Sequence, residues 1–180
     1  MTSPSAVYHY RFSTPFGSAA VIYRKPPFSI VQVLLPRRDS ADLVADAGRA
    51  GWGVRGDDRR AVSLADRISR YFKGGLLSVT AADWKALDMS GLSALQQAVL
   101  AATARIPYAE LSTYRRLAET VGRPKAYRFV GGTMAANPFP VLIPCHRVIR
   151  SDGSLGGFGG GLDLKRRMLD LEAAHRPKSP

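Results

Sequence analysis

The chain has 180 residues, of which 46% are hydrophobic and 22% are charged, as in globular proteins large enough to bury a core. No apolar run approaches the roughly 20 residues that cross a bilayer, and the N-terminus lacks a basic-then-apolar signal pattern. We therefore expect a cytoplasmic protein with no membrane association. The single cysteine, Cys145, excludes an internal disulfide and a Cys-rich zinc site, and it agrees with a reducing compartment.

The formal net charge of +12 is the strongest compositional signal. Such a surplus favours polyanionic partners, with nucleic acid ahead of a membrane surface. The alternative is that the basic residues only keep the surface soluble.

The first third of the chain contains three runs typical of β-strands. They are Tyr8–Phe12, Ala19–Tyr23 and Ile30–Leu35. Turn signals separate the runs, Pro15-Phe16-Gly17 first and Pro26-Pro27 second. The simplest arrangement is an antiparallel meander.

The remainder of this half predicts helices and loops without a chemical motif. We expect a short helix over 39–51, a loop over 51–58, a helix ending at Gly74-Gly75, and irregular or partly extended structure over 76–88. His9 has no neighbours in its strand that could bind a metal ion with it, so a structural role is expected. Residues 1–89 therefore form a small α/β supporting domain.

From Ser90 onward the pattern changes to short helices, which defines a second domain over 90–180. Ser93 can cap a helix to about Arg105, and Ser112 or Thr113 can cap a second helix through Thr120. A third helix should begin near Pro124, because proline suits the first helical turn. Short helices joined by tight, glycine-containing turns outline a helix-turn-helix, although helix pairs are common in α-rich domains.

One face of the third helix is nearly bare. Arg128, Gly131, Gly132 and Ala135 fall at i, i+3, i+4 and i+7, and hence on one side. Each glycine destabilises a helix interior by about 1 kcal/mol relative to alanine. Two in succession therefore indicate that another molecule or another part of the chain approaches the helix backbone closely. A DNA groove fits this face, and so does a neighbouring helix.

Cys145 directly precedes His146 and is either a nucleophile or an inert buried residue. A nucleophile needs a base, but adjacent side chains on an extended segment point to opposite faces, so contact requires a bend or a bridging water. A carboxylate on the other imidazole nitrogen would fix the tautomer. Glu172 is the best-placed acid, on a helix predicted over 162–174.

Two further features of the C-terminal part have two interpretations each. Lys165, Met168 and Glu172 share one helix face, which is either a solvated edge or part of a site. The glycine-rich segment 155–161 is either a wall around a ligand or a linker. It is not a phosphate loop, because the GxxxxGK[ST] order is absent.

Together these residues resemble the O6-alkylguanine-DNA alkyltransferases, which repair alkylated guanine directly. The resemblance is close over about 92–172 and holds only in outline before that. It rests on the following motifs: Pro144-Cys145-His146-Arg147-Val148, Ile106-Pro107-Tyr108, Thr113-Tyr114, Gly122-Arg123-Pro124, Arg128-Phe129-Val130-Gly131, Asn137-Pro138, and Gly160-Gly161-Leu162 with Lys165, Leu169 and Glu172. It implies an α+β fold, with the small α/β domain followed by an α-rich, winged-helix-like DNA-binding domain.

The resemblance also implies catalytic roles. Cys145 would accept the alkyl group irreversibly, activated through a water by His146, which Glu172 orients. Tyr114 would assist the departing guanine, and Asn137 would brace the active-site turn. Each molecule would act once, on O6-alkylguanine and also on O4-alkylthymine in duplex DNA. No cofactor and no metal are expected, because the N-terminal cysteines that hold zinc in some relatives are absent.

DNA and pocket contacts follow from the same resemblance. The target nucleotide would be flipped out, with Arg128 filling the gap from a helix in the minor groove. The residues expected at the DNA are Arg128, Gly131, Gly132, Ala135, Thr113 and Tyr127. Those expected around the flipped base are Pro140, Val148, Phe158, Gly159, Gly160 and Lys165. We expect a monomer, nucleoid-associated if bacterial, and cooperative binding on DNA stays open.

The chain departs from the family pattern at Tyr127 and Phe129, where relatives usually carry small residues, so either these rings pack inward or the groove contact differs. Phe158 replaces a frequent tyrosine. Two alternatives to the repair enzyme are a lesion-binding module that recruits other proteins without transfer, and a Cys-His hydrolase unrelated to DNA.

Overall fold

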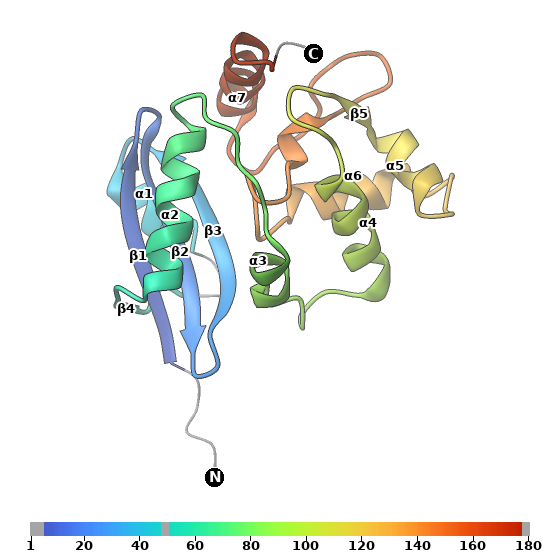
Figure 1. Ribbon diagram of the computed structural model, residues 1–180. Coiled ribbons are helices and arrows are strands. Elements are labelled where there is room, and N and C mark those ends of the chain that lie inside the picture. Colours follow the sequence, from blue (N-terminus) through green and yellow to red (C-terminus); the bar gives the residue numbers. More distant parts are fainter. Residues whose placement is uncertain (1–5, 48–50, 178–180) are drawn as a thin grey trace. The chain divides into compact units, whose positions relative to one another are not determined.

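The computed structural model describes residues 6–47 and 51–177 (Figure 1). The chain forms two compact units, Met1–Asp88 and Met89–Pro180. Each unit has its own helices and strands. Among the described helices, none has the length and apolar character of a membrane span.

The first unit is built on a four-stranded sheet. Strands β1 (Ala6–Thr14), β2 (Gly17–Lys25) and β3 (Ser29–Arg37) form an antiparallel meander, which confirms the prediction. A two-residue strand, β4 (Val54–Arg55), lies parallel to β1 at the edge, so the order is β3-β2-β1-β4. The prediction of a plain loop over 51–58 was wrong here. A strand of two residues is too short to show the alternation of apolar and polar residues from which strands are predicted.

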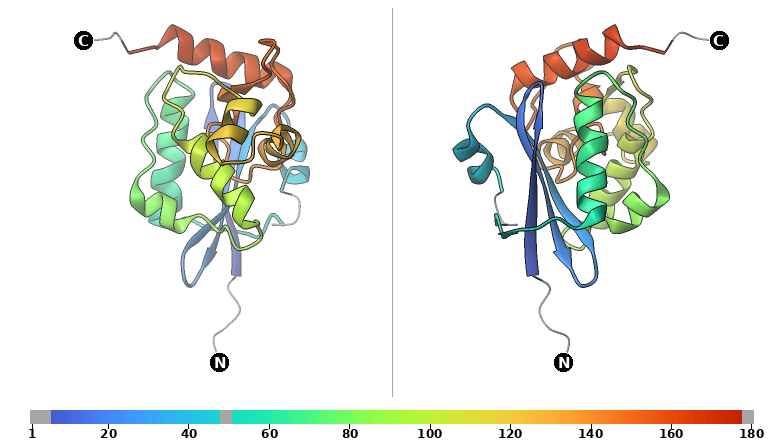
Figure 2. Two further views of the ribbon diagram at one scale, coloured as in Figure 1. Left: turned by 90° about the vertical axis from the view of Figure 1, so that its right-hand side faces the viewer. Right: turned by 60° about the vertical axis from the view of Figure 1, so that its left-hand side comes forward.

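Helices lie on both faces of this sheet (Figure 2). Helix α1 (Ser40–Ala45), capped by Asp39, is shorter than the predicted 39–51, and 48–50 lie outside the described residues. Its Leu43 packs with Ala20 and Ile22 in one core. Helix α2 (Arg59–Tyr71) buries Leu64, Ile68 and Tyr71, as the helical spacing predicted.

Helix α3 (Ala81–Ala86) was missed, since 76–88 was expected to be irregular or partly extended. A complete capping box makes this short helix possible. The Thr80 hydroxyl accepts from the Asp83 N–H (3.1 Å), and the Asp83 carboxylate accepts from the Thr80 N–H (2.7 Å). The Thr-x-x-Asp spacing was the signal in the sequence.

The second unit is mainly helical. Helix α4 (Ala94–Ala104) is capped by Ser93 and α5 (Tyr114–Thr120) by Thr113, as predicted. Helix α6 (Tyr127–Ala135) begins three residues after the predicted Pro124. A separate turn closed by the Ala126 N–H and the Arg123 carbonyl (2.8 Å) takes up Pro124, so the proline precedes the helix.

The C-terminal part of this unit brings distant segments together. Strands β5 (Ser112–Thr113) and β6 (Val148–Ile149) pair in parallel, which places the start of α5 beside the chain that leaves Cys145. A 3-10 turn, η2 (Cys145–Arg147), precedes β6. Helix α7 (Leu162–Ala174) has the predicted bounds and closes the unit.

Candidate active site

Cys145 lies in the η2 turn with only 3% of its surface exposed. Asn137, just after α6, holds this turn. Its amide Nδ2 donates to the Ile143 carbonyl (3.0 Å) and to the Cys145 Sγ (3.1 Å), while its Oδ1 accepts from the Phe139 N–H (3.0 Å). One side chain therefore fixes both the backbone before the thiol and the thiol itself.

The backbone leading to the thiol is strained. Val141 has a φ of 73°, although it is β-branched and not glycine. Such conformations persist only where the surroundings impose them, and they cluster at functional sites. Here Ile143 bonds back to the Phe139 carbonyl (2.8 Å), which keeps this tight turn closed.

His146 and Glu172 meet in the interior, both with no exposed surface. The His146 Nε2 lies 2.8 Å from the Glu172 Oε1. Since the pKa of Glu172 is held at about 2, its oxygen accepts and Nε2 carries the hydrogen. The imidazole therefore presents an unprotonated Nδ1, the form required of a base. The 3-10 turn supplies the bend that an extended segment lacks.

Arg147 shares the same carboxylate. Its Nη2 and Nε donate to the two oxygens of Glu172 at 2.9 Å each, and its Nη1 donates to the Ile106 carbonyl (2.7 Å). The Ala109 N–H completes the set at 3.0 Å. Burial alone would raise the pKa of Glu172, but the hydrogen bonds from His146 and Arg147 outweigh it and lower the pKa. The carboxylate is thus a fixed anion that orients the imidazole.

The Cys145 thiol is protonated in this buried environment. Burial raises the pKa of the Cys145 thiol to about 11, although the Asn137 hydrogen bond and the charge of Lys165 oppose this shift. Burial likewise lowers the pKa of His146, so the imidazole is neutral.

Lys165 reaches the site from α7 and is fully buried. Its Nζ donates to the Val148 carbonyl (2.6 Å) and the Leu155 carbonyl (2.5 Å), which ties β6 to the start of the glycine-rich segment. Burial lowers the pKa of Lys165 to about 8, against an opposing effect of Cys145. Lys165 and Glu172 both point inward, so the solvated-edge interpretation of this face was wrong.

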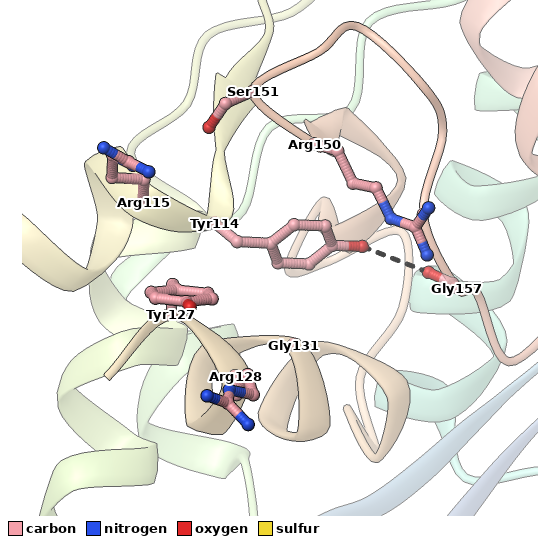
Figure 3. Close-up of a pocket in the computed structure, with 9 residues that line it drawn as sticks. Tyr114, Arg115, Tyr127, Arg128, Gly131, Arg150, Ser151 and Gly157 are labelled. Carbon is pink, nitrogen blue, oxygen red and sulfur yellow. Dashed lines mark hydrogen bonds between the residues drawn. The ribbon is translucent and has the colours of Figure 1, made fainter. Parts of the chain in front are cut away.

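Tyr114 bridges α5 and the glycine-rich segment (Figure 3). Its hydroxyl donates to the Gly157 carbonyl at 3.3 Å. A Cβ at Gly156 would lie 2.7 Å from the Tyr114 hydroxyl, and Gly156 has a φ of +65°. Burial, and then the charge of a Cys145 thiolate, raise the pKa of Tyr114, so the phenol remains a proton donor. The glycine-rich segment therefore packs closely against the Tyr114 side chain and forms one wall of the site.

The nearly bare face of α6 is open. A Cβ at Gly132 would meet nothing within 4 Å, and one at Gly131 only the Tyr114 ring at 4.0 Å. Among the described residues, no neighbouring helix covers Gly132, and only Tyr114, the first residue of α5, comes near Gly131. Arg128 and Ala135 are exposed on it.

Tyr127 and Phe129 flank Arg128 and remain 44% and 41% exposed, so they do not pack inward. The Arg128 guanidinium lies 5.9 Å from the centre of the Tyr127 ring. Tyr127, Arg128 and Tyr114 line one cavity of about 470 Å³ (Figure 3). Arg115 and Arg150 add positive charge to its rim.

The other residues expected around a flipped base are distributed as follows. Pro140, Val148 and Gly160 are buried, Phe158 is partly buried and Gly159 is exposed. The Lys165 Nζ lies 6.0 Å from the centre of the Phe158 ring. Thr113 is partly buried, and its hydroxyl accepts from the Arg116 N–H (3.1 Å) as the cap of α5. The described residues hold no group of three potential metal ligands.

Comparison with known proteins identifies the family of the chain. Residues 94–174 match the model of the 6-O-methylguanine DNA methyltransferase DNA-binding domain. A methylated-DNA–protein-cysteine methyltransferase of Mycolicibacterium paratuberculosis is 35% identical over 166 residues, which is 92% of each chain. The chain belongs to this methyltransferase family. A relative from Haemophilus influenzae is 51% identical over 80 residues, covering 44% of this chain and 45% of that one.

Solved structures of the methyltransferase family agree. The Mycobacterium tuberculosis O6-methylguanine methyltransferase superposes with a TM-score of 0.73 at 30% identity, covering 96% of each chain. A structure of the Mycobacterium tuberculosis protein in complex with DNA gives 0.72 at 31% identity, covering 94% of this chain and 95% of that one. The predicted family and its α+β fold with a DNA-binding helical part are confirmed.

Two residues of this candidate site were not singled out from the sequence. Arg147 was treated only as part of a motif, yet it holds both oxygens of Glu172. Gly156 was treated only as part of a glycine run, yet it is the glycine that admits Tyr114. Arg147 could have been found from the sequence, because it is a charged residue in a mainly apolar segment. Nothing in the glycine-rich segment 155–161 distinguishes Gly156 from the other glycines.

Proposed function

We propose that this methyltransferase repairs duplex DNA by moving the alkyl group of O6-alkylguanine, and of O4-alkylthymine, to Cys145. The observation that carries the proposal is the buried set in which Asn137 holds the thiol and Glu172 holds His146 in one tautomer. The site thus has a nucleophile, a base and a fixed orienting anion.

The first step in the proposal is loss of the thiol proton. It passes from the Cys145 Sγ through a water to Nδ1 of His146, whose imidazolium Glu172 then stabilises. Because burial raises the pKa of the thiol, the thiolate forms only as the alkyl carbon arrives. Lys165 lowers the cost of that negative charge, since its charge opposes the shift.

The transfer step is an in-line displacement. A bond forms between Sγ and the alkyl carbon, and the bond from that carbon to O6 breaks. The electron pair moves onto the guanine, where the Tyr114 phenol donates a hydrogen bond or proton to the departing base. The resulting thioether is not reversed, so each molecule reacts once.

Access to the target requires the nucleotide to leave the stack. In the proposal α6 lies in the minor groove, where the open face of Gly131, Gly132 and Ala135 allows close approach and Arg128 fills the vacated place. Tyr127 and Thr113 contact the DNA beside it. The flipped base is enclosed by Pro140, Val148, Phe158, Gly159, Gly160 and Lys165.

The protein is proposed to act as a monomer in the cytoplasm, associated with the nucleoid if the source is bacterial. The positive charge of +12 supports phosphate-dominated binding with little sequence preference.

Intact mass after incubation with a duplex containing O6-methylguanine tests the proposal. We expect a gain of one methyl group per molecule in the natural chain and no gain in Cys145→Ser. Methyl transfer to Cys145→Ser would show that another residue is the acceptor. Binding to the lesion without a mass change would indicate the recruiting module, and neither binding nor transfer would reopen the hydrolase alternative.

A further inference from the structure

A second polar pocket lies entirely within the first unit and has no part in the chemistry at Cys145. It encloses about 430 Å³. The residues that matter for its chemistry are His9, Arg11, Ser13, Ser18, Trp52 and Arg55. All of them belong to the part of the chain that the structure describes.

Strand register explains why these side chains converge. His9, Arg11 and Ser13 alternate along β1, so they share one face of the sheet. Arg55 of β4 pairs with His9 on one side, and Ser18 of β2 pairs with Ser13 on the other. Residues paired across strands point to the same face.

This is the face that α1 covers, and only in part. His9 pairs with Ile22 and Arg11 with Ala20, and both partners belong to the core that contains Leu43 of α1. Arg11 itself is exposed. The pocket is therefore a polar continuation of that face beyond the α1 core, with the small Ala20 side chain opposite Arg11.

Its charge is uncompensated. Arg11 and Arg55 are both exposed, and among the described residues neither forms an ion pair. No acidic side chain is among the described residues that line the pocket. Other basic residues of this unit, such as Arg24 and Arg67, are paired with Asp88 and Asp83. Two unpaired guanidiniums and two serine hydroxyls form a donor set suited to phosphate oxygens.

One wall is aromatic and held in place. The His9 Nδ1 lies 3.0 Å from the Trp52 carbonyl, and because a carbonyl only accepts, Nδ1 donates. The two rings stack with centroids 4.2 Å apart. An aromatic side chain beside basic residues is the combination with which proteins bind nucleic-acid strands, since bases stack on the ring while the basic residues contact the backbone.

We propose that this pocket binds a phosphodiester of a nucleic-acid strand, so that the first unit carries its own DNA contact. Arg11 and Arg55 take the phosphate oxygens, Ser13 and Ser18 add hydroxyl donors, and Trp52 packs against the adjoining sugar or base. The overall charge of residues 1–88, with 13 Lys and Arg against 8 Asp and Glu, draws the same polyanion to this unit. This binding site is additional to the proposed alkyl transfer. It rests on the proposed function only in that DNA is the polyanion.

The first test compares two double variants that each remove two positive charges from this unit. Arg11→Gln/Arg55→Gln empties the pocket of cations. Arg59→Gln/Arg70→Gln is the matched control, because both arginines are exposed on α2, on the other face of the sheet. Affinity for an undamaged duplex is measured across a salt series.

The logarithm of the affinity falls as the logarithm of the salt concentration rises. Each phosphate contact that is lost makes this fall less steep by about 1. We expect a decrease of one to two from the pocket variant and a clearly smaller one from the control. Equal decreases would overturn the proposal. Both variants should react with free O6-benzylguanine at the rate of the natural chain. If the natural chain itself did not react, that result would contradict the proposed alkyl transfer and would leave the proposal for this pocket standing on the salt series.

A second measurement locates the ligand. The chain has two tryptophans, so Trp84→Phe leaves Trp52 as the single reporter. Its fluorescence should change saturably with an undamaged oligonucleotide, and Arg11→Gln/Arg55→Gln in the same background should abolish the change. No change with the oligonucleotide would overturn the proposal. An equal response to inorganic phosphate at the same phosphate concentration would also overturn it, because the pocket would then bind a small anion.

Discussion

At the scale of single residues, the site depends on groups that hold other groups. Asn137 holds the thiol, Glu172 holds His146, and Arg147 holds Glu172. The pKa of Cys145 is raised and that of Glu172 is lowered, although both are buried. The difference arises because Glu172 receives hydrogen bonds from the Arg147 guanidinium as well as from neutral donors, whereas the thiol receives hydrogen bonds only from neutral amides.

Gly156→Ala tests how closely the glycine-rich segment fits Tyr114. The new Cβ would lie 2.7 Å from the Tyr114 hydroxyl, and the left-handed φ adds strain. Misplacing a catalytic group by about 1 Å can cost on the order of a hundredfold, so we expect repair of a duplex lesion to slow by about 10- to 100-fold. Gly157→Ala is the control, since a Cβ there meets nothing within 4 Å. Equal rates for the two variants would contradict this close packing against Tyr114.

Glu172 predicts a specific pH dependence of stability. Its pKa falls from 4.5 to about 2 on folding, so the folded state favours the carboxylate. The stabilisation is complete above pH 4.5 and is lost as pH falls towards 2. Glu172→Gln should therefore lose less free energy of unfolding between pH 5 and pH 2 than the natural chain, measured by urea denaturation. Parallel losses in the two proteins would contradict the pKa assigned to Glu172.

At the scale of elements, α6 combines an open glycine face with Arg128 between two exposed aromatic rings. Arg128→Ala should slow repair of duplex lesions far more than reaction with free O6-benzylguanine, because a free base needs no flipping. The measurement is the ratio of the two second-order rate constants. An equal loss on both substrates would contradict a role for Arg128 in flipping.

Gly132→Leu tests the open face of α6 independently. Leucine favours a helix interior over glycine by up to about 1 kcal/mol, and at Gly132 a Cβ meets nothing, so stability should hold or rise. Affinity for duplex DNA should nevertheless fall by at least tenfold, because the added side chain blocks the groove contact. Retained affinity in a stable variant would show that this face does not approach DNA.

The elements also show what the sequence could and could not predict. Long periodic segments such as α2 and α7 were predicted well, because one face of each is buried. Helix α3 was missed because it has only six residues and no buried one, so it depends on its capping box. The start of α6 was displaced because Pro124 suits a turn as well as a first helical turn.

The site was predictable mainly where a motif fixed it. Cys145, His146 and Glu172 were named from the sequence. The contact of His146 with Glu172 depends on the 3-10 turn, which no periodicity in the sequence reveals. Tyr127 and Phe129 were left open, because two aromatic residues on a helix can be core or surface. Their exposed fractions of 44% and 41% place them on the surface.

At the scale of the whole molecule, both units are basic, and each has a feature suited to DNA. The second unit has α6 and the Cys145 site, and the first has the Arg11 and Arg55 pocket. Membership of the methyltransferase family accounts for the first feature. In the proposed reaction, each protein molecule takes up one alkyl group at Cys145.

The most direct test is a titration of a fixed amount of protein with an excess of duplex containing O6-methylguanine. Restored guanine is counted at completion, and the modified peptide is sequenced by mass spectrometry. We predict a plateau of one guanine per protein molecule, with the methyl group on Cys145. Repair that continues beyond one lesion per molecule, or a methyl group on any other residue, would contradict the account.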